Sequence, residues 1–168
     1  LVDRNNKPYQ QGTEILNPVK AIFSLSLLSR FFSNNKIRNK YYLDHKRINK
    51  KTKVDVVPGT AFIIRKSLFE KIGGFDERFF LYFEEFDLCK KLIDKGFKNF
   101  ISNSLTVFHK WGESTKKRND INRIFEKSRF YYFKKNYGIF WGLLTEFLLR
   151  IRTQHILLFL ILCVASFL

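Results

Sequence analysis

Ile-Gly-Gly-Phe-Asp-Glu-Arg-Phe-Phe-Leu-Tyr-Phe-Glu-Glu-Phe-Asp-Leu-Cys, residues 72–89, is the stretch that decides how this chain is interpreted. Directly after an aromatic run it places Glu84, Glu85 and Asp87 within four positions. Carboxylates repel one another, and their burial is costly unless a cation, a proton or a polar substrate compensates. The start of a helix would stabilise one or two of these acids. The remaining acid indicates a reaction site in which a carboxylate acts as a general base.

The segments around this stretch alternate between strand and helix patterns. Residues 54–65 are rich in β-branched and apolar side chains, with an interruption at Pro58-Gly59, and Gly96 ends the helix that carries the acids. We expect helices at residues 19–32, 67–72, 84–95 and 120–137, strands at residues 54–65 and 97–108, and a basic loop at residues 34–53. In the short helix, Ser67 would be the N-cap and Glu70 its capping-box partner. The alternation predicts an α/β fold.

Three further residues are weaker candidates when each is taken alone. Gly59 follows Pro58 inside an apolar run, which fits either a bulge or the close approach of backbone to a ligand. Asp76 fits either a turn or a binding site. His109 ends an expected strand, a position where α/β proteins place ligand-binding groups, but a single histidine is more often structural.

Taken together, the motifs resemble the C-terminal half of family 2 glycosyltransferases, especially rhamnosyltransferase-like members that build bacterial surface polysaccharides. The pattern is a glycine-containing strand that ends in Arg, a Gly-Gly-Phe-Asp-Glu turn, Phe-Phe-x-Tyr-Phe, an acidic pair, x-Asp-Leu, and a histidine after the next strand. It is met here by Gly59, Arg65, residues 73–77, residues 79–83, Glu84-Glu85, Asp87-Leu88 and His109. These matches cover about the middle third of the chain.

The resemblance implies a nucleotide-sugar donor, an inverting displacement and the C-terminal half of a GT-A (nucleotide-diphospho-sugar transferase) fold. In the family, the second acid of the pair deprotonates the acceptor hydroxyl, which assigns the catalytic role to Glu85, with Glu84 and Asp87 as a supporting acidic cluster. The histidine, His109, is implied to bind a divalent metal, Mg or Mn, that bridges the donor diphosphate. We assign substrate binding to Gly59, Thr60, Arg65, Asp76, Tyr82 and Trp111.

Two departures from the family pattern affect this assignment. The family usually has Asp where Glu85 stands, and the extra methylene shifts the carboxylate of a base that needs close positioning. The Asp-x-Asp motif of the family's N-terminal half, which binds nucleotide and metal, occurs nowhere in this chain. We therefore expect a fragment of a longer reading frame that on its own transfers no sugar.

Charge and hydropathy point to a membrane surface. The net charge is +16, and residues 30–53 and 116–135 hold most of the basic excess. Such clusters are attracted to anionic lipid headgroups. Residues 139–151 and 156–168 are strongly apolar, although the second run is shorter than the ~20 residues that cross a bilayer. We predict a partial transferase domain at residues 1–137 and an apolar, membrane-associated helical tail at residues 138–168.

The predicted function is the transfer of a sugar such as rhamnose from a nucleotide-sugar donor to a lipid-linked or polysaccharide acceptor at the cytoplasmic face of the cell membrane. Two alternatives stay open. A basic nucleic-acid-binding module would explain the charge and the aromatic residues among the lysines of residues 129–135, but the acidic cluster would repel phosphates. A remnant that only packs or anchors would explain Glu85 in place of Asp and the missing donor half.

Overall fold

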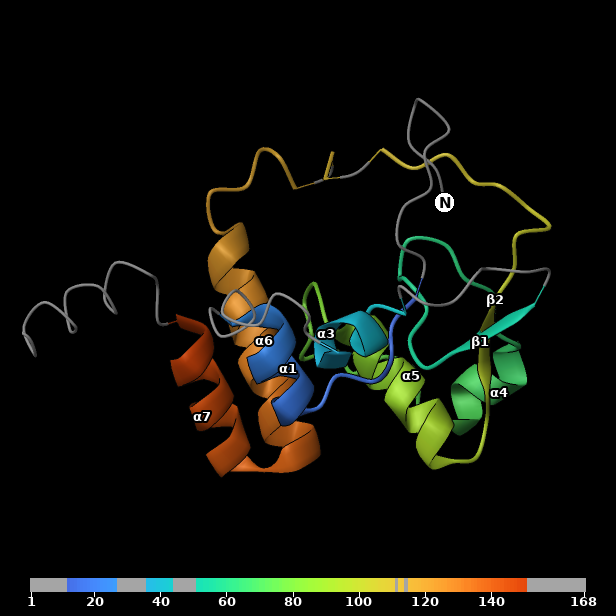
Figure 1. Ribbon diagram of the computed structural model, residues 1–168. Helices are drawn as coiled ribbons and strands as arrows, with labels where there is room; N and C mark the ends of the chain where they lie inside the picture. Colours follow the sequence, from blue (N-terminus) through green and yellow to red (C-terminus); the bar gives the residue numbers. More distant parts are fainter. Residues whose placement is uncertain (1–11, 27–35, 44–50, 111, 114, 151–168) are drawn as a thin grey trace, which may run out of the picture.

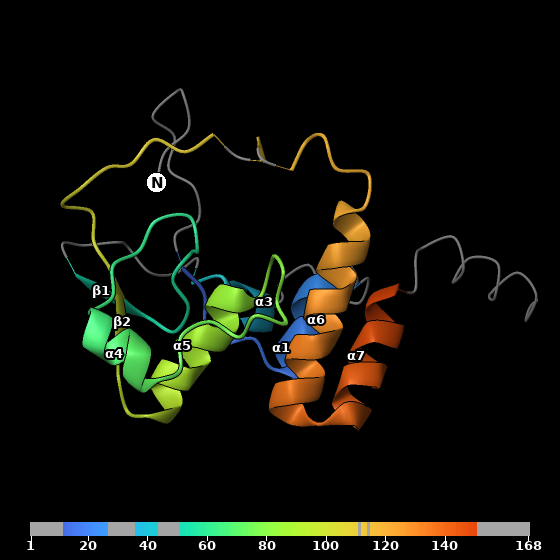
Figure 2. The ribbon, with the colours of Figure 1, turned by 180° about the vertical axis from the view of Figure 1, so that it is seen from behind.

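The computed structural model describes residues 12–26, 36–43, 51–110, 112–113 and 115–150. It combines helices with one small sheet, consistent with an α/β chain (Figure 1). The elements in chain order are α1 (Pro18–Leu25), α3 (Lys36–Tyr41), β1 (Thr52–Val54), α4 (Lys66–Lys71), α5 (Glu84–Asp94), β2 (Asn99–Ile101), α6 (Ile121–Tyr137) and α7 (Ile139–Arg150). The sheet and α4 lie at one side of the molecule, α1, α6 and α7 lie at the other, and α5 lies between them (Figures 1 and 2).

The two strands are far shorter than the sequence predicts. β1 pairs antiparallel with β2, with Lys53 opposite Phe100. The predicted strands at residues 54–65 and 97–108 are therefore wrong over most of their length. Beyond β1, backbone pairing continues only as an isolated bridge between Thr13 and Val56 in the described part of the chain. Pro58 has no N–H to donate and Gly59 has no side chain to pack, which explains why pairing does not continue beyond the bridge at Val56.

The predicted helices agree with the structure more closely than the predicted strands do. α5 and α6 match their predicted ranges, and α1 begins at Pro18, with the Asn17 side chain accepting a hydrogen bond from the Lys20 N–H at 2.8 Å. The later part of the predicted helix at residues 19–32 lies outside the described residues. α4 is capped differently from the prediction, because Arg65 is its N-cap and makes no side-chain cap bond. The basic segment at residues 34–53 was expected to be a loop, but it contains α3.

The main core joins the helices on the α6 side of the molecule. Tyr132 and Phe133 of α6 are fully buried, and they pack with apolar side chains from the N-terminal segment, α3 and the turn before α5. The Tyr132 hydroxyl donates to the Leu16 carbonyl at 3.0 Å, so the one polar atom of that ring is satisfied inside the core. This packing fixes α5 against α6.

The last helix of the described residues, α7, packs on α6 and α1. Gly142 allows the approach, because a Cβ there would stand 3.2 Å from the Lys134 backbone nitrogen. Arg129 and Glu146 form a buried two-bond ion pair at 2.8 and 3.0 Å across the two helices. Within the described ranges, no helix has the length and apolar content needed to cross a membrane. Residues 151–168, the rest of the predicted tail, lie outside the described residues.

Candidate active site

The acidic stretch begins at a sharp backbone turn. Tyr82 and Phe83 both have φ of +67°, the left-handed region that side chains other than glycine rarely occupy. Each such residue costs on the order of 1–3 kcal/mol, and conformations of this kind cluster at functional sites. Phe83 is buried and serves as the N-cap of α5, so packing holds the strained turn in place. The turn sets Glu84 and Glu85 in the first turn of α5.

Glu85 lies against the backbone of Gly59. A Cβ built at Gly59 would stand 3.5 Å from the Glu85 Cβ and 3.7 Å from its carboxyl carbon. The two residues are 26 positions apart in the sequence, and both were predicted to belong to the site. The structure therefore brings together the glycine of the interrupted apolar run and the carboxylate assigned as the base.

The pKa of the Glu85 carboxyl group lies near neutral pH. Burial raises its pKa from the ordinary 4.5 to about 7, the charge of Glu84 adds to that rise, and the Glu85 backbone N–H opposes it. One oxygen of each glutamate, Oε2, is buried and has no hydrogen-bond partner among the described residues. Burial also raises the pKa of Glu84. A carboxylate with a pKa near the working pH can accept and release a proton, as a general base must.

The charge of Glu85 contributes to the raised pKa of two buried side chains. Burial raises the pKa of the Cys89 thiol to about 11, and the carboxylate of Glu85 contributes to the rise. Burial likewise raises the pKa of Tyr41, whose side chain is 4% exposed, with a contribution from Glu85. These effects are consistent with a weakly solvated carboxyl group at Glu85.

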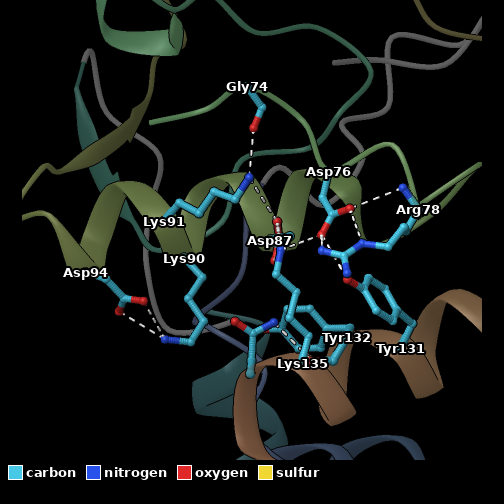
Figure 3. Close-up of polar contacts among 11 residues, drawn as sticks. Gly74, Asp76, Arg78, Asp87, Lys90, Lys91, Asp94, Tyr131, Tyr132 and Lys135 are labelled. Atoms are coloured by element: carbon cyan, nitrogen blue, oxygen red, sulfur yellow. Dashed lines mark hydrogen bonds and ion pairs between the residues drawn. The ribbon is translucent and has the colours of Figure 1, made fainter. Parts of the chain in front are cut away.

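Asp87 has a different environment from Glu85. Its side chain is 1% exposed, and both carboxylate oxygens lie 2.7 Å from Lys135 Nζ on α6 (Figure 3). Lys91, one turn further along α5, is 3.5 Å away and donates to the Gly74 carbonyl at 2.9 Å. Asp87 therefore joins α5 to α6, and its charge is compensated by two lysines.

Asp76 is the second anchor of this network. Its carboxylate accepts hydrogen bonds from Arg78 at 2.8 and 2.9 Å, from the Tyr131 hydroxyl at 3.0 Å and from Lys135 at 2.8 Å (Figure 3). The Arg78 guanidinium holds the pKa of Asp76 well below its usual range, although burial opposes this. Burial alone would lower the pKa of Lys135, but its bonds to Asp76 and Asp87 outweigh that effect and raise it. Asp76 and Lys135 thus stay ionised, and the Asp76–Lys135–Asp87 network ties the turn at residues 73–77 to both helices.

The other predicted substrate-binding residues have less defined positions. Thr60 and Arg65 are exposed, and Tyr82 is half-buried with its ring edge-on to Phe125 at 5.3 Å. Trp111 lies outside the described residues.

The predicted metal ligand stands apart from any metal-binding cluster. His109 is half-buried in the long connection between β2 and α6. In the portion of the chain that the structure describes, no group of three His, Cys, Asp or Glu side chains could hold a metal ion. Among the described residues His109 therefore belongs to no three-ligand cluster, and its role as a metal ligand stays a prediction. Its convergence with Glu85 stays a prediction.

Three residues of the network were missed in the sequence. Arg78 follows Asp76 by two positions, a spacing that allows a local ion pair within a turn, so a signal for it existed. Tyr131 and Lys135 contact Asp76 across 55 and 59 positions, and nothing in the order of residues marks that contact. Only the packing of α6 against the turn reveals them.

Comparison with known proteins gives a partial relationship. No family model and no solved structure matches the chain. Over 57 residues the chain is 39% identical to the N-acetylglucosaminyl-diphospho-decaprenol L-rhamnosyltransferase of Mycobacterium tuberculosis strain CDC 1551 / Oshkosh, and equally to that of strain ATCC 25618 / H37Rv. The match covers 34% of this chain and 19% of each relative, so it spans about a fifth of their length. The similarity supports a glycosyltransferase-like relationship.

Proposed function

We propose that this chain provides the acceptor-activating part of an inverting glycosyltransferase, with Glu85 as the general base. The observation that carries the proposal is the state of Glu85, whose pKa is raised to about 7 mainly by burial and whose Oε2 has no hydrogen-bond partner among the described residues. A buried carboxylate without a partner is costly unless a substrate group completes it. An acceptor hydroxyl is such a group, because it donates a hydrogen bond to the carboxylate and then its proton.

The reaction step balances as a single displacement. The Glu85 carboxylate takes the proton of the acceptor hydroxyl, and the hydroxyl oxygen forms a bond to the anomeric carbon of the donor sugar. The bond from that carbon to the nucleoside diphosphate breaks, and its electron pair leaves with the diphosphate. Gly59 lies beside the base, where a Cβ would stand 3.7 Å from the Glu85 carboxyl carbon, so the backbone approaches the carboxyl group closely.

The substrates are proposed from the similar proteins and from the charge of the chain. The relatives' name specifies an acceptor in which a diphosphate joins a saccharide to a polyprenol. It also specifies L-rhamnose as the sugar that is transferred. We assign the same classes here: a nucleotide-sugar donor and a lipid-linked saccharide acceptor. The net charge of +16 favours the anionic, cytoplasmic surface of the cell membrane as the place where they meet.

The test uses the entire reading frame that contains these 168 residues, expressed with membrane and assayed for sugar transfer to a polyprenyl-diphosphate saccharide. We expect Glu85→Gln to lower kcat by a factor of about 10²–10⁴, the usual contribution of a general base. We expect kcat/KM of the unmodified protein to rise with pH up to a plateau above about 7, because the base must be ionised. Glu84→Gln is the matched control and should retain most of the rate.

Retention of the normal rate and pH profile by Glu85→Gln would contradict the assignment of the base. Glu85→Asp introduces the residue that the family usually has at this position. The kcat/KM of this variant should still rise with pH, whatever its maximal rate. The 168-residue chain assayed alone should show no transfer, and measurable transfer would contradict the expectation that it lacks the donor-binding part.

A further inference from the structure

A cavity of about 500 Å³ lies on the α6 side of the turn that leads into α5. Its volume is within the range of about 300–1,000 Å³ typical of small-molecule sites. One wall comes from the residues before the strained Tyr82–Phe83 turn, and the other comes from α6 and the segment that precedes it. The lining residues are Arg78, Phe80, Arg118, Asp120, Ile124, Lys127, Ser128 and Tyr131.

The charged lining of this cavity is mainly positive. Arg78 and Arg118 are each held by a carboxylate, Arg78 by Asp76 and Arg118 by Asp120 at 2.9 and 3.0 Å. Lys127 is exposed and has no ion pair or hydrogen bond to any described residue. Three cations therefore face one lining carboxylate, Asp120. Guanidinium groups fixed in this way lose little freedom when an anion binds, and they suit phosphate oxygens.

The same cavity also has apolar walls. Phe80 is 71% exposed, and the Arg118 guanidinium lies over its ring at 5.2 Å. Arg78 lies over the Tyr131 ring at 4.9 Å, and Ile124 adds an aliphatic surface. An exposed phenylalanine in a loop beside three cations is suited to a ligand with an anionic group and a hydrocarbon part.

We propose that this cavity binds a diphosphate joined to a polyisoprenoid chain, with Arg118 and Lys127 on the diphosphate and Phe80 on the first isoprene units. The proposal rests on the proposed function, since it assigns the anchoring group of the acceptor to a specific site. The Ser128 hydroxyl donates to the Leu81 carbonyl at 2.7 Å, so the cavity wall is tied to the loop four residues before Glu85.

Binding to the 168-residue chain is measured by titration calorimetry with farnesyl diphosphate, inorganic diphosphate, farnesol and dioctanoyl phosphatidylglycerol. We expect farnesyl diphosphate to bind at least about tenfold more tightly than any of the other three ligands. Equal affinity for inorganic diphosphate would overturn the proposal in favour of a simple anion patch. Equal affinity for farnesol, or for the phosphodiester lipid, would overturn it in favour of an apolar groove or a lipid-headgroup site.

Substitutions locate the site. Lys127→Ala and Arg118→Ala should each weaken farnesyl diphosphate binding about tenfold, the loss expected for one charge-assisted contact. Phe80→Ala should weaken farnesyl diphosphate but leave inorganic diphosphate unchanged. Lys98→Ala removes the same charge from an exposed position next to β2 and should change nothing. An equal loss in Lys98→Ala, or no loss in Lys127→Ala, would overturn the assignment.

The binding assay separates this inference from the proposed function. Lys127 and Lys98 are exposed, so their substitution is compatible with folding, and circular dichroism of each variant checks this. Glu85→Gln should bind farnesyl diphosphate normally, because the base lies outside the cavity lining. Normal binding without sugar transfer by the whole reading frame would reject only the proposed reaction. Transfer without binding at this cavity would reject only the proposed site.

Discussion

At the scale of single residues, Glu85 links stability to pH. Its pKa is raised from 4.5 to about 7 in the folded chain, so the native state binds more protons than the unfolded state between these values. The contribution of Glu85 to the free energy of unfolding should therefore be most favourable below pH 4.5 and should fall as pH rises through 7. A shift of this size corresponds to about 3 kcal/mol. Glu85→Gln removes the penalty, so this variant should be more stable than the original chain at pH 8 and closer to it at pH 4.

Urea denaturation of the 168-residue chain at pH 4, 6 and 8 measures this difference. Glu84→Gln is the comparison, because Glu84 is less buried and is the neighbour whose charge contributes to the shift of Glu85. We expect the Glu84 variant to gain less stability at pH 8 than the Glu85 variant. A constant difference between Glu85→Gln and the original chain at all three pH values would show that Glu85 does not titrate in this range.

Lys135 is the residue on which the network between the helices depends. Lys135→Met would leave the buried Asp87 carboxylate with Lys91 alone, at 3.5 Å. Removing one partner of a buried charge costs about 3–5 kcal/mol. We expect a loss at the lower end of that range, because the Lys135 side chain is 25% exposed and Lys91 remains.

Chemical denaturation measures that loss, and the neighbouring exposed residue provides its control. Lys134→Met removes the same charge one position away and should change stability by less than about 0.5 kcal/mol. Adding Asp87→Asn to Lys135→Met should recover part of the stability, because it removes the uncompensated charge. Equal destabilisation by Lys134→Met and Lys135→Met would contradict this role for the network.

Sequence reasoning at this scale found residues whose chemistry is local and missed those defined by distant packing. The acids at the start of α5 were visible because three carboxylates in four positions are costly, and Gly59 because it interrupts an apolar run. The sequence did not show that Asp87 and Glu85 have different environments. Asp87 faces Lys135 whereas Glu85 contacts Gly59, and that difference depends on which face of α5 meets α6.

At the scale of elements, the left-handed turn before α5 predicts that glycine is more stable than alanine at position 82. Tyr82→Ala and Tyr82→Gly both remove the ring that packs on Phe125, but only glycine adopts φ of +67° without cost. We expect the glycine variant to be more stable than the alanine variant by about 1 kcal/mol, the penalty for a side chain in this conformation. Denaturant titration of the two variants measures the difference. An alanine variant equal to or more stable than the glycine variant would contradict a strained turn.

Helices and strands were not equally predictable from this sequence. α5 follows from its apolar spacing and from Gly96 just beyond its end, and α6 follows from its apolar spacing, so the signal for each lies in or next to the helix itself. The apolar runs at residues 54–65 and 97–108 have the composition of strands, but a strand also requires a partner with free backbone groups. In the described residues, β1 and β2 pair over three residues each, and Phe62 and Ile64 of the first run instead pack on a cluster that includes Leu88 and Leu92 of α5.

At the scale of the whole molecule, charge and apolar surface favour contact with a membrane. The chain carries 31 basic residues against 15 acidic ones, which attracts it to anionic lipid. Phe140, Leu143 and Phe147 are 58–66% exposed and recur at a spacing that places them on one face of α7. An apolar helix face with cations nearby is typical of a helix that lies in the membrane interface.

We therefore expect the chain to bind vesicles that contain phosphatidylglycerol and to bind neutral phosphatidylcholine vesicles weakly. Raising the salt concentration from 0.1 to 1 M shortens the screening length from about 10 to about 3 Å and should reduce binding to the anionic vesicles. Replacing Phe140, Leu143 and Phe147 together by serine should reduce binding further, since each apolar side chain contributes about 1.5–3 kcal/mol when it is removed from water. Co-sedimentation with vesicles measures each change.

The control is Ile63→Ser, because Ile63 is 97% exposed and lies in the loop before α4, at the other side of the molecule from α7. If the α7 face contacts the membrane, Ile63→Ser leaves binding unchanged while the triple variant loses it. If charge alone holds the chain to lipid, the triple variant and the control bind equally and salt abolishes both. That outcome would remove α7 from the proposed membrane surface while leaving the electrostatic part of the proposal intact.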